Sequence, residues 1–179
     1  MIGIARHFKV TYKPENKWMT AKQFNNWVEE YDNAEIQIAN NISNDRKWDV
    51  CYCSNQSRAT RTAKVIFDGK IIITDQLREI GITAVSKSKI KLHLTIWLIL
   101  ARIAWFLSHK SQEESKLQTL IRAKLILDEI EQKYSETNVL IVSHGAFIKT
   151  LTKELDRRGY KGKVDIKPRN GKLYTYNKQ

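Results

Sequence analysis

The chain has 179 residues, with 31 Lys and Arg against 19 Asp and Glu, and so carries a formal net charge of +12. This length suits one domain with a sizeable core, and we expect a single domain over residues 1–179. The charge favours anionic partners, but there is no zinc-finger spacing or aromatic RNA-binding signature, which argues against nucleic acid. The 2 Cys and 4 His lie at scattered positions, so we predict no metal site and no cofactor.

The N-terminal segment predicts a buried strand followed by a helix. The apolar run from Ile2 to Ala5 is too short for a signal peptide, so we expect a cytoplasmic protein. As a central strand, this run would place Arg6 and His7 at its carboxyl end. Thr20 and Gln23 have the form of a capping box, and apolar residues at helical spacing then predict a helix over 21–33.

Two further strands flank a second helix. The stretch from Asp49 to Cys53 predicts a strand, and Ser54 starts the turn that follows it. A helix is expected from about Ser57 to Phe67, ended by Gly69 in the position that a helix C-terminus favours. The isoleucine-rich run from Lys70 to Thr74 predicts the next strand.

Residues 87–110 form an apolar helical insertion whose core, 94–107, is nearly all hydrophobic. It contains Arg102, and at about 1.5 Å per residue it is shorter than a bilayer core, so it does not predict a membrane span. One interpretation is a helix packed on the domain as a lid or buried element. The alternatives are a self-association surface or a membrane-surface anchor, for which Lys87, Lys89 and Lys91 would suit anionic lipid.

A long helix and a fourth buried strand come next. Ser111 and Glu114 have the form of a second capping box, predicting a helix to about residue 135. Its expected apolar face is Leu117, Leu120, Ile121, Leu127, Ile130 and Tyr134. The continuous apolar run from Val139 to Val142 predicts a strand buried on both faces.

The C-terminal part predicts a helix and a hairpin. Apolar spacing indicates a helix from Gly145 to Arg158, which Gly159 ends. The tail from Lys163 to Tyr176 alternates on both sides of an Asn-Gly turn, which is typical of a hairpin. Strands separated by helices predict a three-layer α/β/α sandwich with a mainly parallel central sheet. Because sites in such sheets lie at the carboxyl ends of strands, His7 and His144 should meet on one rim.

Four short motifs fall in order on these elements: Arg6-His7, then Ser54-x-x-x-Arg58-Ala59-x-x-Thr62-Ala63, then Leu77-x-Glu79, and last Ser143-His144-Gly145. Two histidines, arginines and a carboxylate are the side chains that phosphoryl transfer through a histidine needs, because a neutral imidazole can attack phosphorus. The ordered set resembles the histidine phosphatase superfamily, with its phosphoglycerate mutase-like fold.

The resemblance implies a role for each residue. His7 is the nucleophile that takes the phosphoryl group, and Arg6 and Arg58 bind its non-bridging oxygens. His144 donates a hydrogen bond to the same group, and Glu79 gives a proton to the leaving oxygen and later activates water.

Some residues depart from the family pattern or have a second interpretation. Phe8 stands where Gly is usual and Val10 where Thr is usual, so a bulky ring could narrow the pocket. Glu79 could instead be an exposed carboxylate beside Arg78. For Arg61, His93 and His109 we expect no catalytic role, and Lys9 and Lys13 are expected to be solvated.

The leading hypothesis is therefore a metal-independent phosphatase that acts on small phosphomonoesters or on a phosphohistidine protein. One alternative is a phosphoglycerate-type mutase, for which the chain is short. The other is a module that binds a phosphorylated ligand, or a membrane surface, without turnover. The two histidines and Glu79 argue against this last alternative.

Overall fold

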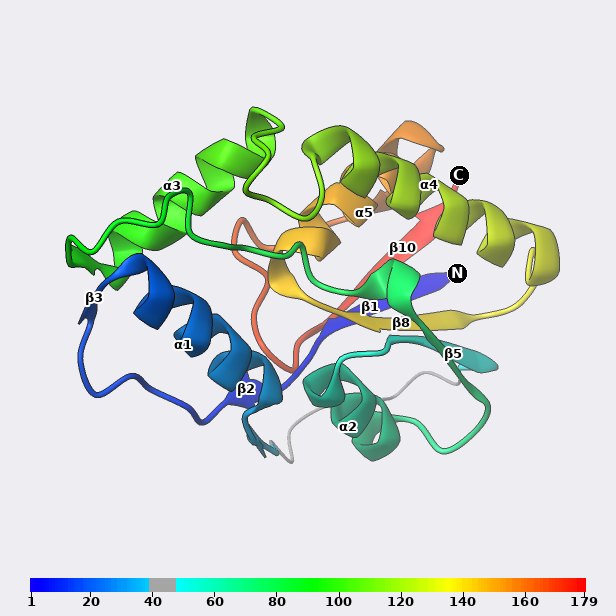
Figure 1. Ribbon diagram of the computed structural model, residues 1–179. Helices are drawn as coiled ribbons and strands as arrows, with labels where there is room; N and C mark the ends of the chain where they lie inside the picture. The colour runs from blue at the N-terminus through cyan, green and yellow to red at the C-terminus, as the bar shows by residue number, and fades with distance from the viewer. Residues whose placement is uncertain (39–47) are drawn as a thin grey trace.

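A computed structural model describes residues 1–38 and 48–179, and a twisted sheet runs through its centre (Figure 1). Within these residues the sheet has 6 strands in the order β6, β5, β8, β1, β10, β9. The strands are β1 Ile2–Arg6, β5 Val50–Ser54, β6 Ile71–Thr74, β8 Val139–Ser143, β9 Tyr160–Gly162 and β10 Leu173–Lys178. The first four in sheet order are mutually parallel, and β10 and β9 add an antiparallel edge. The predicted mainly parallel sheet is thus confirmed.

Helices cover both faces of the sheet, as the buried apolar strands predict. α2 (Ser57–Ile66) lies on one face, and α4 (Lys116–Lys133) and α5 (Gly145–Arg157) lie on the other (Figure 1). Side chains of β1 alternate between the two cores: Ile2 and Ile4 join the α4 and α5 side, while Ala5 joins the α2 side. The layers form the predicted α/β/α sandwich.

Helix α3 (Leu94–Phe106) packs beyond the sheet, next to α1 (Ala21–Asn33) (Figure 1). The predicted capping box of Thr20 and Gln23 is confirmed at the start of α1. Trp97 of α3 stacks on Phe24 of α1 with ring centroids 5.6 Å apart, and its Nε1 donates to the Met19 carbonyl at 2.8 Å. This contact fixes α3 on the domain, as in the first interpretation of residues 94–107.

Short strands tie the connecting segments around these helices. β2 (Lys9–Val10) pairs with β4 (Ile36–Gln37), and β3 (Trp18–Met19) pairs with β7 (Leu92–His93), which leads directly into α3. A short 3-10 helix, η1 (Asp75–Leu77), follows β6.

The second capping box lies four residues later in the sequence than predicted. Ser115 and Gln118 form the box, and α4 begins at Lys116. Glu114 is instead buried, and its carboxylate binds the Arg122 guanidinium at 2.6 Å and 3.2 Å. Leu117 and Ile121 of the expected apolar face are exposed, whereas Ala123 and Ile126 on another side of α4 are buried.

Two other expectations were also wrong. The tail is not a tight hairpin around the Asn-Gly turn: β9 and β10 do pair antiparallel, but the strand before the turn ends at Gly162, and residues 163–172 form a long loop between them. Gly171 turns this loop with φ of 70°. Gly69 does not cap α2, since Phe67 ends that helix in an extended conformation. Gly159 does end α5 with φ of 85°, as predicted.

The buried pair of Glu114 and Arg122 gives a stability prediction. Arg122 also donates to the carbonyls of Gln76 and Arg78, so it ties α4 to the segment that carries Glu79. Glu114→Ala leaves this guanidinium buried without its counter-ion, which should lower the free energy of unfolding by about 3 kcal/mol. Urea unfolding followed by circular dichroism measures the change. The matched variant Glu113→Ala removes an exposed carboxylate and should change stability by less than about 0.5 kcal/mol; equal losses would contradict the assignment.

Candidate active site

The carboxyl ends of β1 and β8 open into a pocket of about 270 Å³, here called the His7 pocket. Arg6, His7, Arg58 and Glu79 line it, together with α1 residues and Arg102 of α3. The parallel pairing of β1 with β8 sets Arg6 opposite Ser143, and the rings of His7 and His144 consequently lie 5.1 Å apart between centroids. The structure therefore brings together all five residues predicted for the site.

His7 is fixed in one neutral tautomer. Its backbone N–H donates to the Ser143 carbonyl at 3.0 Å, and its ring Nδ1 lies 2.6 Å from the Phe8 carbonyl. A carbonyl can only accept, so Nδ1 carries the proton and Nε2 holds a free electron pair. Burial, and then the Arg58 guanidinium, lower the pKa of His7 to about 3, so the ring is uncharged near neutral pH.

Arg58, at the start of α2, is a buried cation with partners on several elements. Its Nη1 binds the Asp32 carboxylate of α1 at 2.8 Å, and its Nε donates to Nδ1 of His144 at 3.2 Å. Only 2% of its surface is exposed. The contacts hold the planar guanidinium beside both histidines. Its Nη2 also donates to Oε1 of Gln56 at 3.3 Å, so some of these bonds have to open before the guanidinium can bind two oxygens of one anion.

Arg6 leaves β1 and lies against the first residue of α5. Its Nη1 donates to the Pro168 carbonyl at 2.9 Å, and its Nε is buried without a hydrogen-bond partner among the described residues. A Cβ atom on Gly145 would lie 3.0 Å from the Arg6 guanidinium carbon, so the glycine makes room for this side chain. A bound oxyanion could satisfy the free donor.

His144 is the N-cap residue of α5, and both of its ring nitrogens have partners. Nδ1 accepts from Arg58, so Nε2 carries the proton and donates to Oγ of Ser54 at 2.8 Å. Burial and the positive charge of Arg58 hold the pKa of His144 well below its usual range. To donate to a bound anion, as the family resemblance implies, the ring has to release Ser54.

Glu79 lies in the His7 pocket and faces the N-terminus of α5. Its carboxylate accepts hydrogen bonds from the backbone N–H groups of Ala146 at 3.2 Å and Phe147 at 3.0 Å. The positive end of a helix favours a carboxylate at this place. The side chain is partly buried, so the alternative of an exposed carboxylate beside Arg78 is wrong.

Several residues of the site belong to none of the sequence motifs. Asp32 pairs with Arg58, and Asn170 in the C-terminal loop donates through its side-chain amide to the His7 carbonyl at 2.8 Å. Arg102 lines the pocket and donates to the Ile80 carbonyl at 3.3 Å. No local pattern identifies these three residues, because each reaches the site through tertiary packing of a separate element.

Phe8 does not narrow the pocket, contrary to expectation. Its side chain is 1% exposed and is not part of the pocket wall, while its backbone N–H donates to Oγ1 of Thr62 at 2.9 Å. Val10 is buried as well. Both side chains that depart from the family pattern therefore lie in the core and not in the pocket.

Residues for which no catalytic role was expected lie outside the His7 pocket. Arg61 pairs with Glu35 at the surface, His93 caps the start of α3, and His109 contacts Ser111. Lys9 and Lys13 are not part of the pocket wall. Among residues 1–38 and 48–179, no three His, Cys, Asp or Glu side chains are grouped to hold a metal ion.

Comparison with solved structures shows the same fold at low sequence identity. The mycobacterial glucosyl-3-phosphoglycerate phosphatase in complex with VO3 has a TM-score of 0.60 and 15% identity, over 98% of this chain and 96% of that one. A histidine-to-alanine mutant of phosphoserine phosphatase from Entamoeba histolytica, in complex with phosphoserine, has a TM-score of 0.55 and 16% identity over 98% and 93%. YhfR of Bacillus stearothermophilus has a TM-score of 0.58 and 17% identity over 93% and 92%.

Sequence comparison identifies the family. The chain matches no curated protein. Residues 30–177 match the family model described as histidine phosphatase superfamily, branch 1, and this range includes Arg58, Glu79 and His144, while Arg6 and His7 precede it. Since the matched range spans most of the chain and the fold is that of phosphoglycerate mutase-like structures, this protein belongs to the histidine phosphatase superfamily.

Proposed function

We propose that this protein hydrolyses phosphomonoesters through a phosphohistidine intermediate on His7. The observation that carries the proposal is the tautomer of His7, whose Nδ1–H is held by the Phe8 carbonyl while Nε2 keeps a free electron pair. A buried imidazole with a pKa of about 3 remains an unprotonated nucleophile through the neutral range.

The reaction has two displacements. Nε2 of His7 forms a bond to phosphorus as the bond from phosphorus to the ester oxygen breaks, and the leaving alkoxide takes a proton. Water then attacks the phosphohistidine, the N–P bond breaks, and inorganic phosphate leaves. Arg6 and Arg58 bind the non-bridging oxygens, and the free Nε donor of Arg6 supports this role.

Glu79 is proposed to move the proton in both steps. It shares the pocket wall with His7, so it lies on the side from which a substrate enters. In this structure its two carboxylate oxygens accept from the N-terminus of α5. Protonating the leaving oxygen requires one of these bonds to open when substrate binds.

The site suits a small phosphate ester. The pocket volume of about 270 Å³ holds little more than a phosphoryl group and a compact organic part. The two phosphatases compared above are named for phosphorylated small molecules, glucosyl-3-phosphoglycerate and phosphoserine, which supports the same substrate class here.

Removing His7 tests the mechanism. His7→Ala should lower kcat for an aryl phosphate by at least about 10³-fold, because the covalent route is lost. Rapid acid-free quench with labelled substrate should trap an acid-labile, alkali-stable phosphoenzyme in the wild type and none in the variant. His109→Ala removes an imidazole outside the pocket and should keep both signals. Undiminished turnover in His7→Ala would refute the phosphohistidine route.

Chelation tests whether a metal takes part. If guanidinium groups supply the positive charge that stabilises the transferring phosphoryl group, then EDTA should leave kcat/KM unchanged within about twofold. Steady-state rates before and after dialysis against EDTA provide the measurement. Loss of activity that added magnesium restores would contradict a metal-independent site.

The low pKa of His7 also predicts how stability depends on pH. The unfolded chain binds a proton at this histidine below pH of about 6.5, while the folded protein does not until about pH 3. Stability is therefore complete above the unfolded pKa and decreases as pH falls. His7→Asn should reduce the slope of unfolding free energy against pH, between pH 6 and pH 4, by about 1.4 kcal/mol per pH unit. Urea titrations at several pH values measure the slope, and an unchanged slope in His7→Asn would contradict the assignment.

A further inference from the structure

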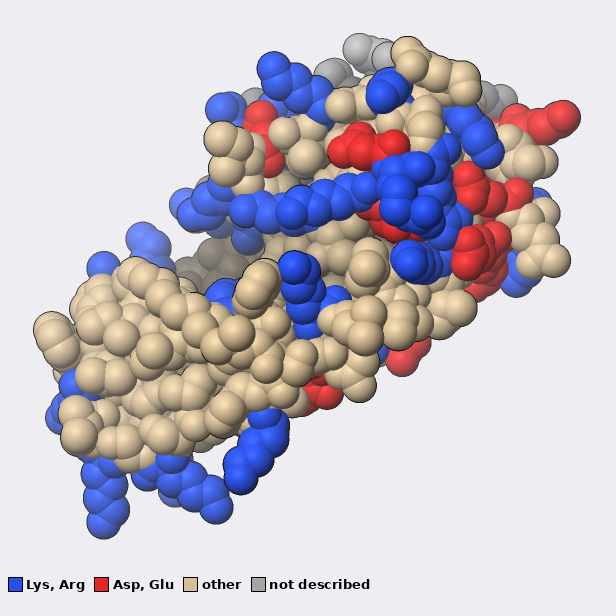
Figure 2. Space-filling model, turned by 90° about the horizontal axis from the view of Figure 1, so that it is seen from above, with Lys and Arg blue, Asp and Glu red and all other residues tan. Residues whose placement is uncertain are grey.

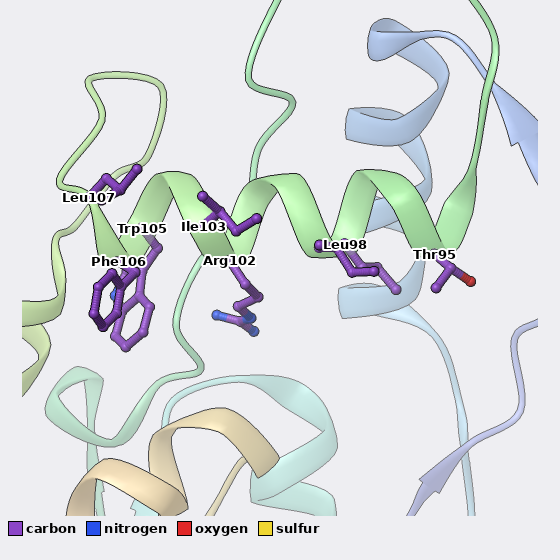
Figure 3. A pocket seen from close by; sticks show the side chains of 8 residues that line it. Thr95, Leu98, Arg102, Ile103, Trp105, Phe106 and Leu107 are labelled. Carbon is purple, nitrogen blue, oxygen red and sulfur yellow. The ribbon is translucent and has the colours of Figure 1, made fainter.

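Helix α3 carries an apolar groove along one flank. The groove, here called the α3 groove, has a volume of about 590 Å³ and is lined by side chains from Thr95 to Leu107 (Figure 3). Ile99 and Phe106 are 54% and 56% exposed, although such side chains normally lie in a core. Among the described residues of its wall, Arg102 alone carries a charge. Contiguous apolar surface of this kind marks a binding site.

The α3 groove adjoins the His7 pocket. Leu98 and Arg102 belong to the walls of both hollows. Arg102 projects from α3 toward the body of the domain, where its Nη1 donates to the Ile80 carbonyl at 3.3 Å (Figure 3). A ligand with its phosphoryl group at His7 that extends past Leu98 would therefore reach the flank of α3.

The dimensions of the groove indicate an extended apolar chain. From Thr95 to Leu107 the helix rises about 18 Å, which is far longer than the His7 pocket needs for a phosphate. Trp105 forms part of the wall and is held by a hydrogen bond from its Nε1 to Oγ1 of Thr119 at 2.9 Å. Because the Trp105 side chain is already fixed, binding a flexible chain does not cost the conformational entropy of ordering this part of the wall.

We propose that the substrate is an amphiphilic phosphomonoester whose phosphate occupies the His7 pocket and whose hydrocarbon chain lies in the α3 groove. The proposal rests on the proposed function and specifies its substrate class. Hydrolysis consumes one water, breaks the P–O ester bond and releases a long-chain alcohol and inorganic phosphate.

The distribution of charge supports an anionic amphiphile. From above, the side of the molecule where α3 lies presents a broad area of uncharged residues with Lys and Arg at its edges (Figure 2). Lys87, Lys89, Lys91 and Lys110 flank α3 in the sequence and are exposed. A second copy of the chain would bring the same positive edge with it, so the like charges would disfavour that occupant.

The test compares alkyl phosphates of increasing chain length below their micellar concentrations. From butyl to octyl to dodecyl phosphate, kcat/KM of the wild type should rise about three- to fourfold per methylene buried. The groove variant Ile99→Ser/Phe106→Ser should lose most of this increase. The matched variant Ile121→Ser/Leu125→Ser changes two exposed apolar residues of α4 and should keep it.

Binding of non-hydrolysable phosphonates separates this proposal from the proposed function. Calorimetry should show tighter binding of dodecyl phosphonate than of methyl phosphonate, and the preference should vanish in the groove variant. That result without turnover of any ester would support the groove and refute the phosphatase activity. Chain-length preference that is absent in the wild type, or retained in the groove variant, overturns the proposal.

Two other occupants would also overturn it. Sedimentation of a wild-type dimer that the groove variant dissociates, with no chain-length preference, would assign the groove to a second copy. Flotation with anionic vesicles that the groove variant abolishes, again without chain-length preference, would assign it to a membrane surface. Among residues 1–38 and 48–179, no helix has the length and hydropathy of a membrane span.

Discussion

The parallel register between β1 and β8 is the constraint on which the site depends. It sets Arg6 opposite Ser143, the last residues of the two strands, and each of them is followed directly by a histidine. The two strands are buried on both faces, so a slip of one residue would turn apolar side chains from one core to the other. The core that stabilises the sheet therefore also fixes the distance between the imidazole rings of His7 and His144.

Positive charge without enough negative charge is the main electrostatic feature of the site. Arg58 has Asp32 as a counter-ion, whereas Arg6 has only a carbonyl partner and a free Nε among the described residues. Burial first, and then these guanidinium groups, lower the pKa of His7 and of His144 and keep both rings uncharged. An oxyanion would complete the charge balance and satisfy the free donor, so the same arrangement that keeps His7 uncharged would also attract the phosphoryl group that His7 is proposed to attack.

The sequence predicted the layers of the fold and the five motif residues, because these depend on local patterns. Continuous apolar runs identify strands that are buried on both faces, and the site residues follow them directly. Local sequence patterns gave wrong predictions where tertiary contacts determine the structure. Glu114 looked like a capping residue, but it pairs with Arg122 in the core. Alternation around Asn170 predicted a tight turn between two strands, but residues 163–172 form a long loop, and Asn170 donates to the His7 carbonyl.

Through Arg102, the apolar helix α3 contributes a charge to the polar site that it lies beside. On α3 it is the one charged residue, and it lies where the groove meets the His7 pocket. Burial lowers its pKa, while the negative charge of Glu79 opposes that effect, so the guanidinium and the carboxylate are electrostatically coupled. A hydrocarbon chain in the groove would exclude water from around Arg102 and strengthen this coupling, because charges interact more strongly in a medium of lower dielectric constant. A chain in the groove would in this way change the electrostatic environment of Glu79, the residue proposed to move the proton. The apolar part of a substrate would then contribute to the chemical step as well as to binding.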